Sequence, residues 1–262
     1  MITEGGLFKN AIVRLPGEKF ADGLTTASFG AANYEKALEQ HARYREALVH
    51  CGLEVTVLEA DASHPDSTFV EDAAVLTRSR AILTRPGAPS RVDEPAALRE
   101  PLERFFPALR EIRSPGTLEG GDVCEAGGHF LIGISRRTNP EGARQLAALL
   151  AAEGYASSFV DIREVRGILH LKSGLAYVGD NNLVVVDELA RRPEFAGFNL
   201  IRVTPDERHA ANCLLVNEYV LLASDCPVLK DSLERQGYKV LEIDLAEFRK
   251  MDGGLSCLSL RF

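Results

Sequence analysis

The 262-residue sequence lacks several features that would place it in a specialised class of protein. It contains no run near the roughly 18 apolar residues that a membrane span needs. Its first residues show no basic stretch followed by an apolar one, so no secretory signal peptide is expected. No basic stripe is visible and the formal charge is −8, which argues against a general nucleic-acid binder. We therefore expect a cytoplasmic protein that has neither a membrane nor a nucleic acid as partner.

Motifs for disulfides, metals and nucleotides are missing as well. The five cysteines are odd in number and widely spaced, without a CxxC pair, so a disulfide framework is not expected. There is no HExxH, no paired metal-ligand spacing and no glycine-rich nucleotide-binding loop. The sequence therefore predicts neither a resident metal nor a cofactor, and it leaves five reduced thiols, of which one could be chemically active.

What the sequence does contain is a weak internal repeat. Four times a helical pattern ends at a glycine and an apolar strand pattern follows. The glycines are Gly52, Gly154, Gly197 and Gly237. A helix commonly ends on a left-handed residue, and glycine adopts that conformation at the least cost. A fifth, degenerate copy runs from Glu94 to Arg113, where Pro107 is expected to end the helix.

Pairs of apolar runs, typical of β-hairpins, lie between one helix–strand pair and the next. They are residues 73–76 with 81–84, 123–124 with 130–134, 175–178 with 183–186, and 214–216 with 220–223. The first run, Ala11 to Arg14, has no partner upstream, and the last, Cys257 to Phe262, has none downstream. Pairing these two runs closes a ring of five ββαβ units. We therefore expect an α/β fold with pseudo-five-fold symmetry and a single domain over residues 1–262.

Polar or glycine-rich segments open the hairpins at equivalent positions of the five units. They are residues 69–72, 118–122, 170–174, 211–213 and 252–257. In a ring, equivalent positions lie at equal radius, so residues far apart in the sequence meet. This arrangement predicts one shared site.

Two residues of these segments could carry chemistry. Cys257 follows Gly253-Gly254, a pair that lets the backbone approach a ligand closely, and a cysteine thiolate is a nucleophile. His170 has apolar neighbours, which are expected to bury it and to keep its pKa near neutrality or lower. Such a group can give and take a proton. The competing interpretation is a packed core cysteine and a structural histidine. The remaining histidines are interpreted as surface or helix residues: His41, His50, His64, His129 and His209.

Charged residues in the same regions suggest the substrate. Asp66, Asp72 and Glu119 could accept the paired N–H bonds of a guanidinium, although aspartate is also common in turns. Arg85 and Arg137 follow strands and could bind a carboxylate, although most arginines are solvated surface residues.

Seven segments, in this order, resemble the dimethylarginine dimethylaminohydrolase family. They are residues 69–72, 83–91, 119–123, 136–139, 169–173, 210–213 and 252–257. The resemblance spans nearly the whole chain. It implies the five-bladed α/β propeller of guanidino-group modifying enzymes, in agreement with the repeat.

The resemblance also implies an activity, the hydrolysis of N-omega-methylated L-arginine to L-citrulline through a covalent S-alkylthiouronium intermediate. Cys257 would be the nucleophile, His170 the acid and base, and Glu119 would hold the imidazole. The substrate-binding residues implied are Phe20, Asp66, Glu71, Asp72, Arg85, Arg137, Met251 and Asp252. Among these, Asp66 and Asp72 would hold the guanidinium, and Arg85 and Arg137 the α-carboxylate. Phe20 would stand at the entrance, where the family usually has leucine, and Met251 where valine is common. No cofactor is implied, and the expected partner is a small cationic amino acid.

Several alternatives stay open at this point. A hydrolase, deiminase or dihydrolase of the same fold could act on another guanidino or ureido compound, such as arginine. A non-catalytic propeller that binds the ribosome would share the five-fold shape but would not need a cysteine, a histidine and acids in matching positions. The sequence leaves a homodimer open, and on composition Thr25 to Gly30 is a candidate lid.

Overall fold

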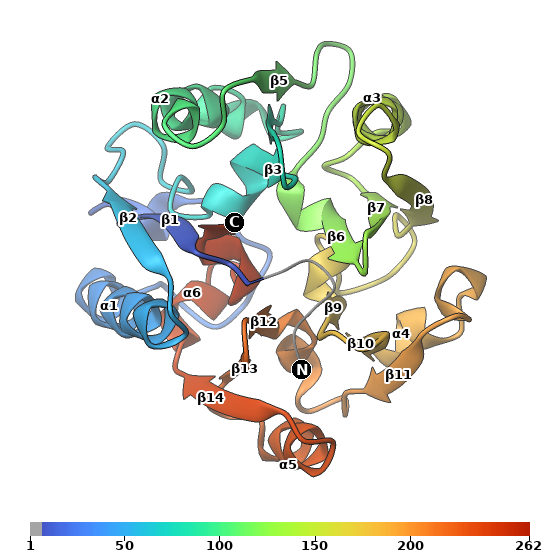
Figure 1. Ribbon diagram of the computed structural model, residues 1–262. Coiled ribbons are helices and arrows are strands. Elements are labelled where there is room, and N and C mark those ends of the chain that lie inside the picture. Colours follow the sequence, from blue (N-terminus) through green and yellow to red (C-terminus); the bar gives the residue numbers. More distant parts are fainter. Residues whose placement is uncertain (1–6) are drawn as a thin grey trace.

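The computed structural model describes residues 7–262 and arranges them as a ring of five units (Figure 1). Each unit holds one three-stranded sheet. The first two strands of a unit are antiparallel, and the second and third are parallel, with a helical connection between them. The larger helices α1, α2, α3 and α5 lie at the periphery of the ring. The predicted ring of ββαβ units is confirmed.

The strands of the five sheets follow the same order in every unit. The sheets are β15 (Leu260–Arg261), β1 (Asn10–Arg14) and β2 (Glu54–Leu58); β3 (Ala74–Leu76), β4 (Ala81–Leu83) and β5 (Leu109–Glu111); β6 (Val123–Ala126), β7 (His129–Ile134) and β8 (Ala156–Asp161); β9 (Leu175–Tyr177), β10 (Asn182–Val185) and β11 (Asn199–Arg202); and β12 (Leu214–Val216), β13 (Tyr219–Ala223) and β14 (Lys239–Ile243).

Helices connect the two parallel strands of each unit, and one more precedes the last turn of the chain. They are α1 (Tyr34–His50), α2 (Arg99–Glu103), α3 (Pro140–Ala151), α4 (Asp187–Ala190), α5 (Pro227–Arg235) and α6 (Ala246–Arg249). None of the helices within residues 7–262 is both long enough and apolar enough to cross a membrane.

The helix ends follow the local sequence at most of the predicted positions. The side chain of Asn33 caps α1 by accepting a 2.9 Å hydrogen bond from the Lys36 N–H, and Gly52 follows this helix with φ +92°. Gly154 and Gly237 also have positive φ, as expected. The fourth glycine of the predicted series, Gly197, does not.

The Gly197 prediction was wrong because that unit has no long helix. Its helix α4 stops at Ala190, and a separate 3-10 turn, Pro193–Phe195, follows an extended Arg192. In the degenerate unit, α2 ends at Glu103, so Pro107 is not the residue that ends it.

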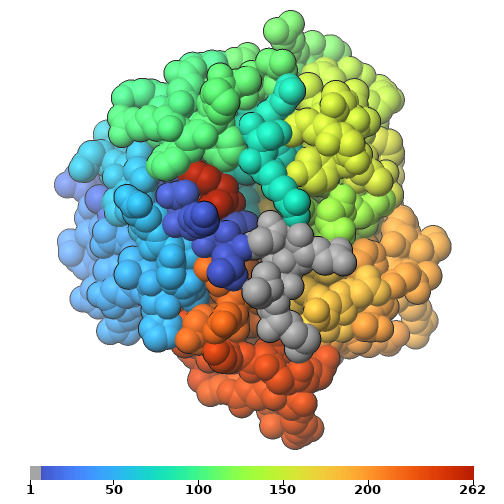
Figure 2. Space-filling view, viewed as in Figure 1, coloured from blue at the N-terminus to red at the C-terminus, as the bar shows by residue number. Residues whose placement is uncertain are grey.

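Ring closure joins the two ends of the described chain. Ala11 pairs with Arg261 and Ile12 with Leu260 in an antiparallel ladder, which confirms the expected fifth hairpin. In Figure 2 the first described residues (dark blue) and the last (red) lie against each other near the middle of this face. The strand is shorter than predicted, because Cys257 lies in a 3-10 turn rather than in the strand.

A short 3-10 turn precedes the first strand of every unit. These turns are η2 (Val70–Ala73), η5 (Gly120–Asp122), η6 (Leu171–Ser173), η8 (Arg208–Asn212) and η9 (Ser256–Leu258). Contacts run from η9 to η2, from η2 to η5, from η5 to η6 and from η6 to η8. The equivalent positions predicted from the repeat are therefore neighbours in space, and the candidate site is built on them.

Candidate active site

A narrow pocket gathers most of the residues that the sequence singled out. Asp66, Asp72, Arg137, His170 and Cys257 all line it, although they come from widely separated parts of the chain. Met251 and Asp252 line it too. Its open volume of about 20 Å³ is room for roughly one water molecule. The cysteine, the histidine and the acidic groups therefore face a common hollow.

His170 is held by two neighbouring turns. It directly precedes η6, and its backbone N–H donates to Ser173 Oγ at 3.3 Å. Its Nε2 lies 2.6 Å from Glu119 Oε2 and 3.9 Å from Asp72 Oδ1. Gly121 packs against the ring so closely that a Cβ on this residue would lie 2.8 Å from ring atoms. A glycine is therefore required at this position of η5.

The charge state of His170 differs from the sequence-based expectation. Burial lowers the pKa of the imidazole, as predicted, but the negative charge of Asp72 and the hydrogen bond to Glu119 outweigh it. With a further contribution from Asp122, they raise the pKa of His170 to about 9. The expectation of a pKa near neutrality or lower was wrong, and His170 is an imidazolium at neutral pH.

Glu119 lies behind the imidazole rather than in the pocket. It is fully buried, and its Oε1 accepts a 3.0 Å hydrogen bond from the Gly87 N–H and lies 3.4 Å from Arg137 Nη1. Burial raises the pKa of this carboxyl. The hydrogen bond to His170 and the positive charge of His170 lower the pKa by more, so the net shift is downward. Glu119 is therefore placed to orient the ring of His170.

Two of the aspartates that line the pocket, Asp66 and Asp72, are in different electrostatic states. Asp72 accepts from the Gly121 N–H at 3.0 Å and pairs with Arg91 at 2.8 Å. Burial opposes its ionisation, yet the charges of His170 and Arg91 lower the pKa of Asp72 to about 2. Asp66 accepts from the Leu24 N–H at 3.0 Å, and burial raises its pKa. A bound cation would favour the ionised form of both carboxyls.

Cys257 lies in η9 and is partly exposed toward the pocket. Burial from bulk water raises the pKa of its thiol to about 12, with further contributions from the charges of Glu71 and Asp72. The group is therefore a neutral thiol in the absence of a cation. Asn212 fixes this turn, because its Oδ1 accepts from the Ser256 N–H and its Nδ2 donates to Ser256 Oγ, both at 3.0 Å.

Phe20 does not stand at the entrance. Its side chain is 1% exposed and packs against Phe69 and Phe248, with ring centroids 6.0 and 5.1 Å away. The 3-10 turn Phe20–Asp22 buries this ring, and Leu24, two residues after the turn, lines the pocket instead. Leu24 is 41% exposed. No signal in the sequence distinguished these two apolar residues.

Arg85 was also predicted to belong to the site, and the structure places it outside the pocket. It does not line the pocket, and its guanidinium donates to the Gly116 carbonyl at 3.4 Å. Arg91, in the same segment 83–91, lines the pocket and is held by Asp72 and Glu94, each at 2.8 Å. Both arginines lie in the segment 83–91, and only the fold shows that Arg91, not Arg85, faces the pocket.

Glu71 lies beneath the pocket rather than in its wall. It accepts from Ser256 Oγ at 2.6 Å, and Lys172 Nζ and Arg261 Nη2 lie 2.6 and 3.3 Å from it. These contacts tie η2 and η6 to the turn that carries Cys257. Glu71 therefore supports the turn that carries Cys257 and does not line the pocket.

The candidate lid, Thr25 to Gly30, is mostly exposed and is tied to the pocket rim. Asp252 Oδ2 accepts from the Thr26 N–H at 2.5 Å, and Thr25 Oγ1 donates to the Lys250 carbonyl at 2.8 Å. Together with the bond from Leu24 to Asp66, these contacts tie the segment to Asp66 and Asp252, two residues that line the pocket.

This arrangement defines a class of protein, an α/β propeller with a thiol, an imidazolium and acidic groups around one pocket. A family model described as arginine deiminase matches residues 62–211, more than half of the chain. The chain is 46% identical to N(G),N(G)-dimethylarginine dimethylaminohydrolase of Pseudomonas aeruginosa, over 98% of this chain and 100% of that one. It is 35% identical to the protein of the same name from Streptomyces coelicolor, over 97% and 96% of the two chains.

The chain therefore belongs to the dimethylarginine dimethylaminohydrolase family, as the sequence motifs predicted. Solved structures agree. The Pseudomonas aeruginosa enzyme, as a cysteine-to-serine variant complexed with citrulline, has a TM-score of 0.95 at 46% identity, covering 98% of this chain and 100% of that one. The N-terminal domain of ArgZ, an arginine dihydrolase from cyanobacteria, has a TM-score of 0.87 at 20% identity, covering 97% of both chains. The latter likeness shows the fold alone, the five-bladed α/β propeller.

Proposed function

We propose that this protein hydrolyses L-arginine methylated on a terminal guanidine nitrogen to L-citrulline and methylamine or dimethylamine. One observation carries the proposal: Cys257, His170, Asp66 and Asp72 line a single pocket in a chain that is 46% identical to a dimethylarginine dimethylaminohydrolase. The solved relatives include an adduct with S-methyl-L-thiocitrulline, which supports covalent chemistry on an arginine-like substrate.

Binding would use the charges of the pocket. Asp66 and Asp72 present carboxylates to the planar guanidinium, which is recognised well by paired acceptors. Arg137, together with Arg91, offers positive charge for the α-carboxylate. The pocket is too small for an amino acid, so Leu24 and the segment tied to Asp252 must move for substrate to enter.

The first half of the reaction begins when the guanidinium lies next to Cys257. Its positive charge favours the thiolate, and the thiol proton passes to solvent. The sulfur attacks the central guanidine carbon and forms a tetrahedral adduct. His170 gives its proton to the alkylated nitrogen, and the bond between that nitrogen and the carbon breaks. The alkylamine leaves, and an S-alkylthiouronium remains on Cys257.

The second half regenerates the enzyme. Neutral His170 takes a proton from water as the water attacks the same carbon. The carbon–sulfur bond then breaks, the second proton of the water passes to the departing sulfur, the Cys257 thiol is restored and neutral citrulline leaves. The free alkylamine takes up from solvent the equivalent of the proton that the thiol released. Water is the only co-substrate in this scheme.

A citrulline-release assay with asymmetric dimethylarginine, monomethylarginine and arginine tests the proposal. We expect kcat/KM for the methylated substrates to exceed that for arginine by roughly 10–200-fold, the discrimination that one small apolar group supports. Cys257→Ser should remove turnover and keep a native circular dichroism spectrum, whereas Cys124→Ala, a buried thiol outside the pocket, should keep turnover. His170→Gly should bind substrate without turning it over.

Two results would contradict the proposal. Arginine turned over as fast as the methylated substrates would move the protein to another member of the wider family. Normal turnover by Cys257→Ser would remove the covalent mechanism altogether.

The setting of the activity follows from the same features. We propose one catalytic domain that works in the cytoplasm without nucleic acid, and all five cysteines are free, as expected in a reducing compartment.

We also propose a homodimer. Two exposed apolar side chains support it, Val49 of α1 and Val57 of the neighbouring β2. Gel filtration with light scattering would decide the oligomeric state.

A further inference from the structure

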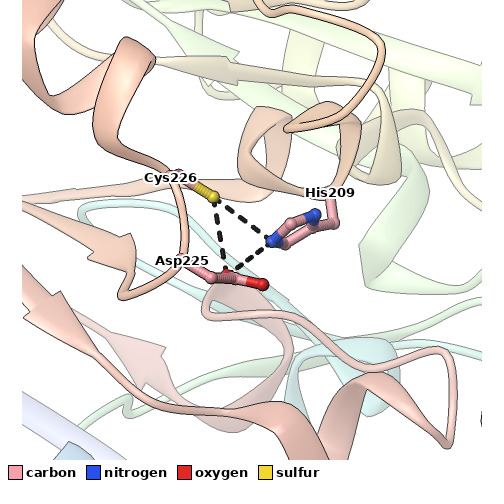
Figure 3. A group of neighbouring side chains, drawn as sticks. All are labelled: His209, Asp225 and Cys226. Atoms are coloured by element: carbon pink, nitrogen blue, oxygen red, sulfur yellow. Dashed lines mark hydrogen bonds and ion pairs between the residues drawn. The ribbon is translucent and has the colours of Figure 1, made fainter.

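A second group of reactive side chains lies outside the pocket, in another part of the ring (Figure 3). His209 belongs to η8, and Asp225 and Cys226 directly precede α5. Cys226 Sγ is 3.2 Å from His209 Nε2, and Asp225 Oδ1 is 2.8 Å from the same nitrogen. Sγ and Oδ1 are 3.7 Å apart. A sulfur, a nitrogen and an oxygen from three side chains therefore face one point.

This geometry is not that of a catalytic relay. In a cysteine–histidine–acid relay, the nucleophile and the acid contact opposite nitrogens of the ring. Here Cys226 and Asp225 both contact Nε2 of His209. Proton transfer from the thiol through the ring to the carboxylate is therefore excluded by the arrangement.

Hydrogen bonds alone cannot satisfy all the neighbours of His209 Nε2. Besides the sulfur and the carboxylate, Arg249 Nη1 lies 2.7 Å from the same Nε2. A ring nitrogen carries either one hydrogen or one lone pair, so it can serve only one of these three neighbours well. A positively charged ion that binds the nitrogen, the oxygen and the sulfur at once satisfies all three donor atoms, and it requires the Arg249 guanidinium to move away from Nε2 while it keeps its contact with Asp225 Oδ2.

We propose that His209, Asp225 and Cys226 form a binding site for a divalent transition metal of the zinc class. Imidazole, thiolate and carboxylate are the ligands that such ions take, whereas calcium and magnesium prefer oxygen alone. Three protein ligands leave a fourth position for water or for another molecule. Cys226 would bind as a thiolate, its proton passing to solvent.

The observed separations are close to those of a tetrahedral site. Bonds of about 2.0–2.3 Å place tetrahedral ligand atoms roughly 3.3–3.8 Å from one another. The pair formed by Cys226 and Asp225, at 3.7 Å, already falls in that range. The two contacts of His209 Nε2, at 3.2 and 2.8 Å, reach the lower end of that range when they lengthen by about 0.1 and about 0.5 Å.

The segments that carry these ligands are fixed to each other. Glu207, two residues before His209, accepts hydrogen bonds from the Val228 and Leu229 N–H groups at 2.7 and 2.8 Å. These residues lie in the first turn of α5, directly after Cys226. Asp225 Oδ2 accepts from Arg249 at 2.6 Å, which orients the carboxylate as partners of metal ligands do. The Cys226 residue is fully buried, whereas the Asp225 side chain is 53% exposed, so an ion can enter from solvent.

The cluster is separate from the pocket but close to it along the chain. Arg249, which contacts His209 and Asp225, also lies over the ring of Phe29 at 5.5 Å, in the segment Thr25 to Gly30. A metal ion could therefore change activity by binding at the cluster or by binding the Cys257 thiol in the pocket. The test must read the metal at Cys226 directly, in a protein that lacks the Cys257 thiol.

Cobalt(II) is the appropriate probe, because its absorption reports both sulfur ligation and tetrahedral geometry. Metal-free Cys257→Ser protein is titrated with Co²⁺ and then with Zn²⁺. We expect one ion bound per chain, a thiolate-to-cobalt charge-transfer band in the near ultraviolet, an intense visible band, and loss of both bands when Zn²⁺ is added. In the Cys257→Ser protein, the pocket offers carboxylates, an imidazole and the thioether of Met251, but no thiol. A thiolate-to-cobalt band therefore cannot arise there.

Variants in the same background decide the ligands. Asp225→Asn, on an exposed side chain, and His209→Ala should weaken Co²⁺ binding by more than the roughly 10–100-fold that loss of an outer-shell partner costs. Cys226→Ser should remove the charge-transfer band, and Cys124→Ser, the matched buried control, should keep it. A band that persists in Cys226→Ser would overturn the assignment. So would the absence of any Co²⁺ or Zn²⁺ binding to a folded Cys257→Ser protein, which would make the cluster a hydrogen-bonded group only.

Discussion

At the scale of single residues, the pocket holds His170 and Cys257, the proposed acid and the proposed nucleophile, in different charge states. His170 is positive because Asp72 and Glu119 outweigh the effect of its burial, whereas burial and nearby carboxylates keep Cys257 a neutral thiol. In the proposed mechanism, the positive charge of the substrate guanidinium favours ionisation of the Cys257 thiol.

Glu119 is the residue whose removal should change the charge of His170. We expect Glu119→Gln to lower the pKa of His170 from about 9 by roughly 1–3 pH units, because the variant loses a carboxylate 2.6 Å from Nε2. At neutral pH a smaller fraction of the ring would then be protonated, and turnover should fall. The measurement is a titration of the His170 ring by NMR in the Cys257→Ser background. Glu100→Gln, an exposed glutamate on α2, is the matched control. An unchanged pKa would remove Glu119 from its proposed positioning role.

At the scale of elements, α1 contains a histidine that belongs to the core. His41 is completely buried, neither of its ring nitrogens has a hydrogen-bond partner, and its ring lies 6.2 Å from that of Phe248. Burial, and next the charge of Arg45, lowers the pKa of His41 to about 4. Protonation of this ring in the folded protein therefore costs free energy of folding.

This histidine should make the protein sensitive to acid. The unfolded chain binds a proton near pH 6.5 and the folded chain only near pH 4, so stability is present above 6.5 and is lost as the pH falls between these values. Down to pH 4.5 the loss from this one group is about 2–3 kcal/mol in the free energy of unfolding. We expect His41→Leu to reduce the drop between pH 7 and pH 4.5 by that amount, measured by urea denaturation.

The control is His50→Leu, which removes an exposed histidine from the same helix. If His41→Leu loses as much stability on acidification as the parent protein, the acid sensitivity arises elsewhere.

At the scale of the whole molecule, five similar units depend on one short closure. Strand β15 has two residues, and the Lys9 and Asn10 N–H groups donate to the Phe262 carbonyl at 2.9 and 2.8 Å. Phe262 packs against Phe105 and Phe106 of the next unit, each with centroids 4.9 Å away. The same segment carries Cys257, so the pairing that closes the ring also places Cys257 at the pocket.

Weakening this closure should destabilise the whole protein. Leu260 is 4% exposed, and Leu260→Ala is expected to lower the free energy of unfolding by about 2–5 kcal/mol. Urea denaturation followed by circular dichroism measures the change. Val228→Ala, at a side chain that is 56% exposed, should change it by no more than about 0.5 kcal/mol. Equal midpoints for Leu260→Ala and the parent protein would show that the ring does not depend on β15.

Comparison of prediction and structure shows where local patterns are sufficient. The caps of α1, the positive φ of Gly52, Gly154 and Gly237, and the four internal hairpins follow from a few neighbouring residues. Gly197 failed because Pro193 divides its helical segment, an interruption that the glycine pattern alone does not weigh. The pairing of the first and last runs was also predictable, since a repeat leaves one unpaired strand at each end.

By itself the sequence determined the repeat, the turns that carry the reactive groups and the family, because these depend on local chemistry and on the order of motifs. Only the tertiary structure decided which side chains of those segments face inward: Leu24 and not Phe20, Arg91 and not Arg85. It also decided the charge of His170 and brought Cys226 to His209 across a hairpin. The physical reason is that electrostatic energy and burial depend on distances between atoms, and residues far apart in the chain acquire those distances only when the ring closes.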